Sequence, residues 1–493
     1  MTDRRVEDKR SAPEASAPAT ALVKNSGDID GRTLAILPWL VSIAFLMQML
    51  DGTIVTTAIP VIAKDLGESP LRLQAVIISY MLTTAVLIPA SGWVADRFGT
   101  RRVFLAAIIL FSLGSLFCAL SSNLTALVAS RALQGAGGAL LVPVGRLTVL
   151  KSFPRAQMVR VLSFITIPAL LGPLGGPVLG GFLVQYASWP WIFFINLPLG
   201  LLGGILSMRY FPDLRERREL GFDWLGFVLF GAAMVCLSLS LEGPGDMHMS
   251  AELASALGLA GVAGMAVYWL RARRVREPLF TPDIFRTRSF SVGLIGNIFA
   301  RLCNGALPFL TPLLLQVGLG YSPFVTGLLM LPLAAAGMLG KVLINRLLEV
   351  FGYRRFLLVN TLLLGLLAMS FAFIGAQTPV TAMVLLFTCL GVINSMQFTT
   401  MNTVTLIDLP QRHESDGNSL LSVVIQISTS FGVAVAAMLM RLHTPLATQA
   451  ATHSLEAFQF AYIMVGASAA LSALIFLFVP KDAGRGGRKT DGR

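Results

Sequence analysis

The fold is decided by residues 73–121, which read LQAVIISYMLTTAVLIPASGWVA (73–95), DRFGTRR (96–102) and VFLAAIILFSLGSLFCALS (103–121). Two apolar runs flank a short loop that carries one aspartate and three arginines. A bilayer core about 30 Å thick is crossed by about 20 apolar residues in a helix that rises about 1.5 Å per residue. The stretch therefore predicts two spanning helices joined by a charged turn in water.

The same pattern recurs along the chain. Of its 493 residues, 55% are hydrophobic and 13% are charged, whereas soluble domains are about 25% charged. Apolar blocks such as 357–367 lack the alternation that a membrane β-barrel would need. We therefore predict an all-α polytopic membrane protein with fourteen spans. The spans are expected at residues 36–62, 73–95, 102–121, 123–149, 159–184, 191–211, 222–241, 252–271, 289–317, 322–346, 354–375, 379–407, 417–441 and 456–480.

The basic residues predict the orientation of the spans. About 33 of the 38 Lys and Arg residues fall in alternate connections, and such residues remain on the cytoplasmic side. The pattern predicts a multi-pass protein of the bacterial inner membrane with both termini in the cytoplasm. The net charge of +12 then reflects topology and contact with anionic lipid headgroups, and we expect no nucleic-acid partner.

An internal repeat predicts two related halves. Asp96–Arg97 near the second span and Asn345–Arg346 near the tenth are each followed by a glycine and paired arginines. Related bundles that rock about a central site are common in secondary transporters. The expected organisation is a disordered cytoplasmic tail (1–34), an N-terminal six-helix bundle (35–212), two inserted linker helices (213–275), a C-terminal six-helix bundle (276–480) and a basic cytoplasmic tail (481–493).

The composition argues against enzyme and metal chemistry. All four cysteines lie inside apolar spans, and the four histidines are scattered singly in loops, so we predict neither a metal site nor a nucleophile with its base. The chain has no Gly-x4-Gly-Lys-Ser/Thr loop, so ATP is not the expected energy source. An ion gradient, with no bound cofactor, is the remaining driving force.

The loop after the second span resembles the signature of the major facilitator superfamily. It contains Gly92, Asp96, Arg97, Gly99, Arg101 and Arg102. The whole chain resembles the fourteen-helix drug and proton antiporters of the EmrB/QacA type, and residues 304–309 and 417–422 are similar to an MdtD-like subgroup. We expect Asp96 to pair with arginines and with the positive end of a neighbouring helix, as a conformational latch. The alternative is that these charges only hold the loop in the cytoplasm.

The fifth span carries the sharpest functional signal. Its residues Gly172, Gly176, Pro177, Gly180 and Gly181 match the pattern Gly-x3-Gly-Pro-x2-Gly-Gly, which marks antiporters in this family. Glycines four residues apart let another helix approach closely, and the proline removes a backbone hydrogen bond, so we expect an irregular helix. The alternative is ordinary packing of small residues.

Two buried charges are candidates for the coupling site. The first span contains Asp51, and the fourth contains Arg131 in an Arg-x2-Gln-Gly pattern; both sequences resemble family motifs. Asp51 and Arg131 lie roughly 16 Å and roughly 12 Å from the outer ends of their helices, so their depths permit contact. We predict that they form a proton-coupling pair. A static structural ion pair is the alternative.

A set of further polar residues within the spans is expected to line a substrate cavity. They are Gln48, Gln134, Arg301, Asn304 and Gln397. Hydrogen bonding between helices is the alternative for each of them. The resemblance implies proton-coupled export of drugs or other small amphipathic compounds by alternating access. Export of an anionic metabolite, or more distantly a polytopic membrane enzyme, remains open, as does a periplasmic adaptor.

Overall fold

The computed structural model describes residues 30–215, 221–246, 249–443 and 455–480, together with Ala483. Within these residues the chain forms helices and no β-strand. The predicted tails 1–34 and 481–493 lie almost entirely outside the described residues, so the structure does not bear on them.

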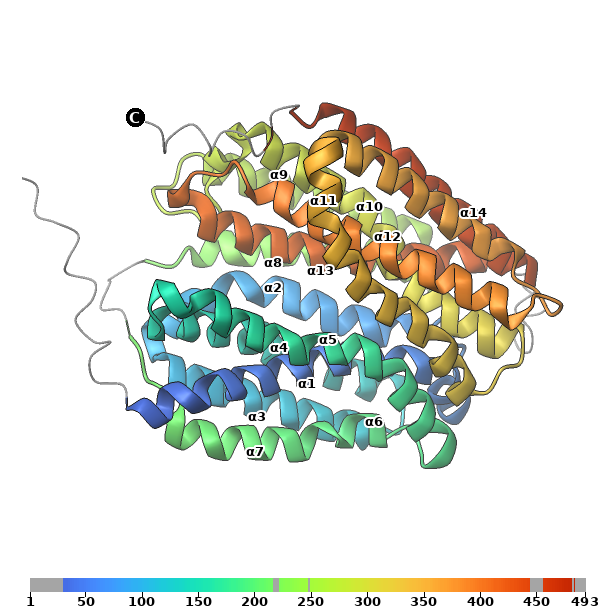
Figure 1. The fold of residues 1–493 in the computed structure, drawn as a ribbon, viewed down its shortest axis with the longest axis horizontal. Coiled ribbons are helices and arrows are strands. Elements are labelled where there is room, and N and C mark those ends of the chain that lie inside the picture. The colour runs from blue at the N-terminus through green and yellow to red at the C-terminus, as the bar shows by residue number, and fades with distance from the viewer. Residues whose placement is uncertain (1–29, 216–220, 247–248, 444–454, 481–482, 484–493) are drawn as a thin grey trace, which may run out of the picture.

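The helices that precede residue 211 form one group, which lies in the lower part of Figure 1. α1 packs against α5, α4 and α7, while α4 also contacts α2 and α3. This group comprises α1 (Gly31–Leu66), α2 (Gln74–Phe98), α3 (Thr100–Ala119), α4 (Leu124–Ser152), α5 (Arg155–Tyr186), α6 (Trp191–Phe194) and α7 (Asn196–Tyr210). α1 and α4 are thereby brought together at the centre of the group.

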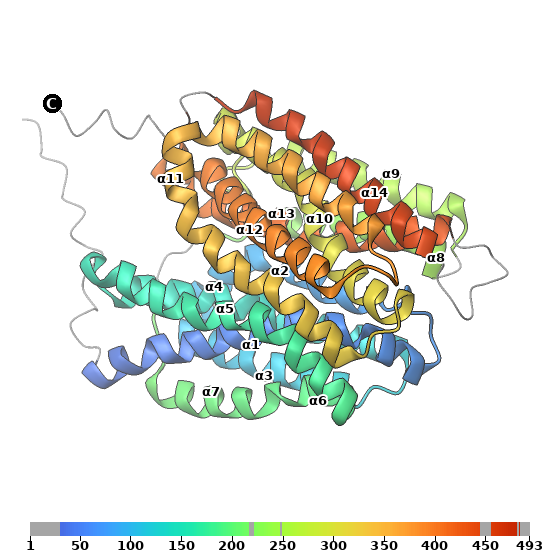
Figure 2. The ribbon, with the colours of Figure 1, turned by 45° about the vertical axis from the view of Figure 1, so that its right-hand side comes forward.

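The helices after residue 288 form a second group, which lies above the first in Figures 1 and 2. It comprises α10 (Arg288–Leu313) with the π-helix η3 (Leu314–Gly318), α11 (Pro323–Ser370) with η4 (Phe371–Phe373), α12 (Val380–Leu406), η5 (Gln411–His413), α13 (Glu414–Leu442), and α14 (Leu455–Ser472) with η7 (Ala473–Phe478). α10 packs against α13 and α12, and α11 packs against α12 and α14. The two groups are called the N-terminal and C-terminal halves below.

α11 contains two of the predicted spans. Thirteen described helices are long and apolar enough to cross a membrane, and the segment 323–373 is 51 residues long, enough for two crossings of a core about 30 Å thick. The chain reverses at Gly352, where φ is 69° and ψ is 163°. Only glycine adopts this conformation without strain. α11 therefore consists of two membrane-spanning helices that meet at Gly352, and the fold keeps fourteen crossings.

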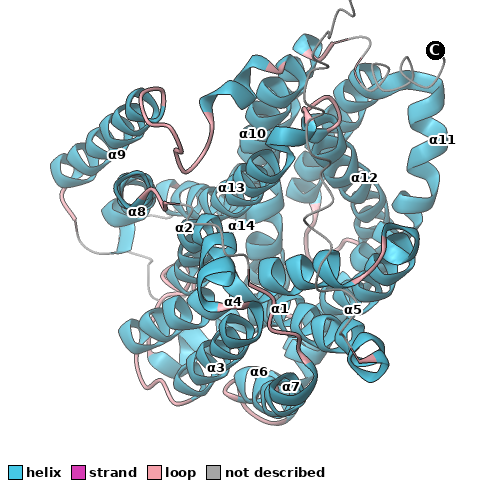
Figure 3. Ribbon diagram, turned by 90° about the vertical axis from the view of Figure 1, so that its left-hand side faces the viewer, coloured by secondary structure: helices cyan, strands magenta, loops and turns pink. Residues whose placement is uncertain are grey.

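The linker helices α8 (Trp224–Asp246) and α9 (Ala251–Ala272) form a hairpin beside the junction of the halves. α8 contacts both α2 and α13, and Figure 3 shows α8 between α9 and these two helices. Asp223, before α8, accepts a hydrogen bond from Gly226 N (2.9 Å) and pairs with Arg271 at the end of α9 (2.7 Å). Asp223 also accepts from Leu279 N (3.3 Å), so the hairpin is fastened at one end to the segment that leads through η2 (Pro282–Arg286) into α10.

The two halves pack against one another along α2 and α13, and at one end they also meet through α5 and α11. We call this the far end, and we call the opposite end, which carries Arg97–Arg102 and Arg346–Arg355, the arginine-rich end. At the far end α5 packs against α11, where a Cβ on Gly327 would lie 2.3 Å from the Pro177 carbonyl oxygen. Gln316 on η3 also donates to the carbonyl of Thr57 on α1, which joins the two halves a second time (2.9 Å). The molecule is thus closed at the far end.

Candidate functional site

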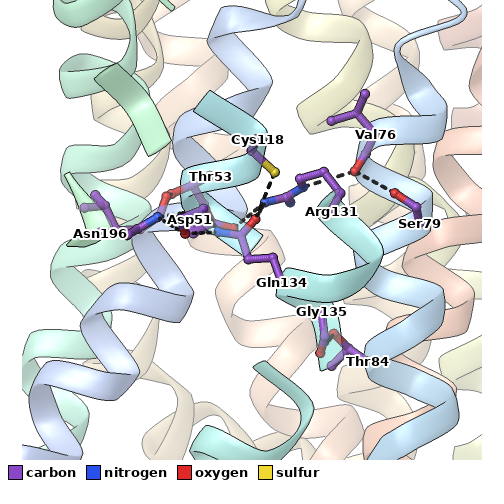
Figure 4. Close-up of polar contacts among 12 residues, drawn as sticks. Asp51, Thr53, Val76, Ser79, Thr84, Cys118, Arg131, Gln134, Gly135 and Asn196 are labelled. Carbon is purple, nitrogen blue, oxygen red and sulfur yellow. Dashed lines mark hydrogen bonds and ion pairs between the residues drawn. The ribbon is translucent and has the colours of Figure 1, made fainter. Parts of the chain in front are cut away.

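Asp51 and Arg131 form an ion pair inside the N-terminal half. Arg131 Nη1 on α4 lies 2.5 Å from Asp51 Oδ2 on α1. The exposed fraction of the Asp51 side chain is 0% and that of Arg131 is 2%, so neither side chain points at lipid or bulk water. Figure 4 shows the two residues facing one another between their helices. A buried charge needs a counterion, and Asp51 and Arg131 are the counterions of one another.

Two amide side chains hold the other oxygen of the carboxylate. Gln134 Nε2 donates to Asp51 Oδ1 at 2.7 Å, and Asn196 Nδ2 donates to the same atom at 3.1 Å. Both amides also donate to the Ser115 hydroxyl, at 2.7 Å and 3.3 Å (Figure 4 shows the Asp51 contacts). An ionised carboxylate only accepts hydrogen bonds. Arg131, Gln134 and Asn196 therefore supply three hydrogen-bond donors to the Asp51 side chain.

Sequence reasoning did not assign Asn196 and Ser115 to this network, and it placed Gln134 in the substrate cavity. The only available signal was that each is a polar residue in an apolar run. Asn196 begins α7 directly after the short break at Ile195, and that position brings its amide to Asp51. One-dimensional spacing does not show which face of α7 meets α1.

The guanidinium of Arg131 is enclosed by α2 and by the start of the sixth span. Its Nε donates to the Val76 carbonyl at 3.2 Å. Its Cζ lies 4.4 Å from the centre of the Tyr80 ring and 5.9 Å from that of Phe193. Aromatic faces attract cations, and the attraction is larger where water is excluded. Arg131 is thus held from every side by protein.

The glycines of the fifth-span motif form the contact between α5 and α1. A Cβ on Gly172 would lie 2.7 Å from the Leu50 amide nitrogen, and one on Gly180 would lie 2.6 Å from the Ile54 carbonyl oxygen. A Cβ on Gly176, between them, would lie 2.1 Å from the Thr53 hydroxyl oxygen. These contacts bracket Asp51. The motif therefore fixes the turn of α1 that carries the carboxylate.

The remaining motif residues face the other half. A Cβ on Gly181 would lie 2.2 Å from the Pro323 carbonyl oxygen on α11. The Pro177 carbonyl packs closely against Gly327 of the same helix. The helix assignment continues through Pro168, Pro173 and Pro177, so the expected irregularity does not interrupt α5. One face of α5 thus contacts the helix of Asp51, and the adjoining face contacts the opposite half.

The loop that resembles the superfamily signature joins α2 and α3 to the ends of α4 and α7. Asp96 Oδ1 lies 2.9 Å from Lys151 Nζ in the last turn of α4, whereas the sequence predicted arginine partners. Arg101 Nε donates to the Phe211 carbonyl. Gly99 has φ 91°, and a Cβ there would lie 2.2 Å from Asp213 Oδ1, so only glycine fits.

The other residues of this loop face water. Gly92, Arg97 and Arg102 are exposed, and the first two line a cavity at the arginine-rich end. The cavity has a volume of about 2310 Å³ and lies between the halves. It is lined by α2, α4, α12, α13 and the segments that flank the linker hairpin. Its charged lining residues are Asp96, Arg97, Arg146, Asp213, Arg215, Asp223, Arg276, Glu277, Glu414 and Asp416.

None of the five side chains predicted to line a substrate cavity belongs to this lining: Gln48, Gln134, Arg301, Asn304 or Gln397. Gln397 lies between α11 and α12, where its amide accepts from Asn360 (2.8 Å) and donates to Thr361 (2.6 Å). Oδ1 of Asn304 has no hydrogen-bond partner in the described residues. The binding roles of these residues remain predictions.

Arg301 lies one residue behind the cavity wall. Its Nη2 donates to Asn402 Oδ1 at 2.7 Å, and Asn402 lines the cavity. Its Nε donates to Asn297 Oδ1 at 2.6 Å, and its Cζ lies 4.3 Å from the Phe398 ring centre. No carboxylate in the described part of the chain pairs with it. Arg301 is 2% exposed, so its charge is buried without a counterion.

Comparisons with known proteins agree with this architecture. A sequence profile of the Major Facilitator Superfamily matches residues 41–433. The chain belongs to the major facilitator superfamily. This facilitator is 47% identical over 447 residues to the "Putative multidrug resistance protein MdtD" of Serratia proteamaculans, covering 90% of this chain and 93% of the relative. It is also 47% identical to the protein of the same name from Klebsiella pneumoniae, over 452 residues, 90% of this chain and 95% of the relative.

Solved structures share the fold of this facilitator at low sequence identity. A POT family transporter in complex with 5-aminolevulinic acid aligns with a TM-score of 0.68 at 17% identity, over 91% of this chain and 96% of that chain. A D-xylose-proton symporter aligns with a TM-score of 0.66 at 16% identity, over 92% and 99%. The family confirms the predicted fold class and the prediction of a membrane transporter rather than an enzyme, and the relatives confirm the MdtD-like resemblance.

Proposed function

We propose that this facilitator exports small amphipathic compounds in exchange for protons, with Asp51 and Arg131 as the coupling pair. The observation that carries the proposal is the fully buried Asp51–Arg131 pair at the contact between α1 and α4. Ionisable side chains inside a membrane are rare and commonly belong to proton relays or substrate paths. The relatives named as multidrug resistance proteins support an export substrate of drug type.

The proposed cycle depends on the distance between carboxylate and guanidinium. While Arg131, Gln134 and Asn196 donate to Asp51, the carboxylate holds its charge. A rearrangement of α1 against α4 that withdraws these donors would favour a neutral, protonated carboxyl. The open cavity would face the cytoplasm, because the arginine-rich loops are expected on that side. Substrate would enter there, and a proton bound from the other side would drive the return.

α5 contacts both α1, which carries Asp51, and α11 of the C-terminal half, and this supports a link between the proton site and the conformational change. α5 touches the Asp51 turn of α1 through Gly172 and Gly176, and it touches α11 through Gly181. A shift of α1 on protonation would therefore move the surface on which α11 closes the far end. Packed helices switch between discrete arrangements rather than deform continuously.

The test is transport by the purified protein in proteoliposomes under an imposed pH gradient. Ethidium and succinate serve as a cationic and an anionic probe. Asp51→Asn is expected to abolish proton-driven flux, since an amide cannot exchange the proton. Asp65→Asn is the matched control, because Asp65 lies on the same helix near the far end, where it accepts from Trp189 Nε1 (2.6 Å). Wild-type flux in Asp51→Asn would refute proton coupling through this residue.

Arg301 supports a second candidate, export of an anionic compound. Its charge has only amide and aromatic partners, and Asn402 separates it from the cavity. A ligand carboxylate would supply the missing counterion through charge-assisted hydrogen bonds. The succinate arm of the experiment separates the candidates: Arg301→Gln is expected to abolish succinate flux if anions are the substrate, and to spare ethidium flux if cations are.

A further inference from the structure

Tyr80 places an unpartnered hydroxyl group between the buried ion pair and the cavity. Its ring packs on the Arg131 guanidinium, and the residue is 4% exposed. The hydroxyl oxygen has no hydrogen-bond partner in the described part of the chain. Buried polar groups in proteins are nearly always hydrogen-bonded, and the exceptions are often partners of bound water or functional groups.

Gln48 repeats this feature on the facing helix. It lies on α1 one turn before Asp51, it is 9% exposed, and its Oε1 also has no partner among the described residues. Its side chain neighbours the Tyr80 hydroxyl, and no hydrogen bond of ordinary geometry joins the two within the described residues. Two such oxygens side by side offer a binding place for a water molecule, which needs two to four polar partners.

Gly138 makes room for the hydroxyl. A Cβ at this position would lie 2.7 Å from the Tyr80 hydroxyl oxygen. Gly138 follows Arg131 by seven residues on α4 and precedes the cavity residue Pro143 by five, distances of about 10 Å and about 7.5 Å along the helix. The hydroxyl therefore lies at a level between the ion pair and the inner end of the cavity.

We infer that Tyr80, with Gln48 and a bound water, forms the path by which the proton of Asp51 leaves for the cavity. The inference rests on the proposed function. In the transfer, the Asp51 O–H bond breaks and the proton passes to the bridging water. That water protonates the Tyr80 oxygen while the Tyr80 O–H proton passes to water in the cavity. Asp51 is left ionised and Tyr80 neutral.

The surroundings of the hydroxyl suit this role. The charged groups that face it are Asp51 on α1 and Arg131 on α4. The positive charge of Arg131 disfavours a second positive charge, such as an excess proton, beside it. The neutral Tyr80 hydroxyl can both accept and donate a hydrogen bond. Positioned hydroxyl groups and water chains act as proton carriers in many proteins. The Arg-x2-Gln-Gly-x-Gly-Gly segment then has a second function, because its last glycine admits the Tyr80 hydroxyl.

The test uses Tyr80→Phe, which keeps the ring over Arg131 and removes only the hydroxyl. Proteoliposomes carry a trapped pH dye, and the probe is ethidium, or succinate where the wild-type protein carries it. Proton-driven flux and the accompanying lumenal pH change are expected to fall about tenfold or more. Counterflow exchange of the same probe, which needs no net proton transfer, is expected to remain at the wild-type rate. Tyr462→Phe, a buried tyrosine whose hydroxyl lies 3.2 Å from Thr311 Oγ1, is the matched control.

Each outcome has one meaning. Wild-type proton-driven flux in Tyr80→Phe, with Asp51→Asn inactive, overturns the path while leaving the coupling pair intact. Equal losses of driven flux and counterflow assign the hydroxyl a structural role and also overturn it. Active Asp51→Asn instead refutes the proposed function. Gly138→Ala is a second variant, expected to impair driven flux by displacing the hydroxyl, with Gly175→Ala as control because a Cβ there meets nothing within 4 Å.

Discussion

The N-terminal half buries a charged pair, and the C-terminal half buries a single charge. Asp51 and Arg131 neutralise one another, and none of the atoms of this pair reaches the cavity lining. Arg301 has two asparagine acceptors and a phenylalanine ring, and it lies directly behind the cavity residue Asn402. The first arrangement suits a switch that stores a proton. The second suits contact with a substrate.

The largest expected effect comes from Arg131→Met. It leaves the Asp51 carboxylate buried without its counterion, and breaking such a pair costs about 3–5 kcal/mol. We expect a loss of this size in the free energy of unfolding, measured in detergent, together with loss of transport. Asp51→Asn/Arg131→Met should recover most of the stability and none of the proton-driven flux. If Arg131→Met alone were as stable as the wild type, the Asp51 carboxyl would already be neutral in the folded protein.

Arg301→Met sharpens the comparison, because it removes a charge that has no carboxylate partner. The substitution removes an unfavourable buried charge, which stabilises the fold. It also leaves the side-chain oxygens of Asn297 and Asn402 without their donor, which costs about 1–3 kcal/mol for each oxygen that stays unpaired. Water in the cavity can reach Asn402. We therefore expect the free energy of unfolding to change by less than about 2 kcal/mol. A loss as large as that of Arg131→Met would reveal that Arg301 is part of the structural framework rather than a free cation.

The difference between the halves also marks what the sequence could predict. Hydropathy predicted the fourteen spans, because lipid allows few solutions for an apolar run. The depths of Asp51 and Arg131 along their helices allowed contact, and the structure places them 2.5 Å apart. The coupling role that we assign to them is still a prediction.

Rotation about a helix axis was not predictable in the same way. Asn196 reaches Asp51, and Gln397 turns towards α11, because of how neighbouring helices pack. Lys151 takes the place expected for an arginine beside Asp96, since the end of α4 reaches that loop. Each of these contacts joins residues more than 30 positions apart. Local periodicity carries no information about such partners.

Gly172→Ala tests whether the contact between α5 and α1 holds the buried pair in place. The added Cβ would lie 2.6 Å from Met49 Cβ and 2.7 Å from the Leu50 amide nitrogen, so α1 must shift next to Asp51. Overpacking of this kind costs about 1–3 kcal/mol. We expect destabilisation in this range and reduced proton-driven flux, by thermal unfolding and transport assays. Gly175→Ala, whose Cβ would meet nothing within 4 Å, should change neither; equal behaviour of the two variants would contradict the close contact.

Asp96→Asn should have the smallest effect on stability, although it breaks an acid–base pair as Arg131→Met does. The Asp96 and Lys151 side chains are 29% and 23% exposed at the cavity rim, so water replaces much of what the pair provides. Ion pairs that water reaches contribute about 0.2–1 kcal/mol, and salt screens them. We expect a loss within this range in the free energy of unfolding at low salt, and a smaller loss at 1 M salt, where the Debye length is about 3 Å. A loss of several kcal/mol that persists at high salt would mean that Asp96 behaves like a buried charge. In that case the difference in burial would not explain why the Asp51–Arg131 pair contributes more to stability than the Asp96–Lys151 pair.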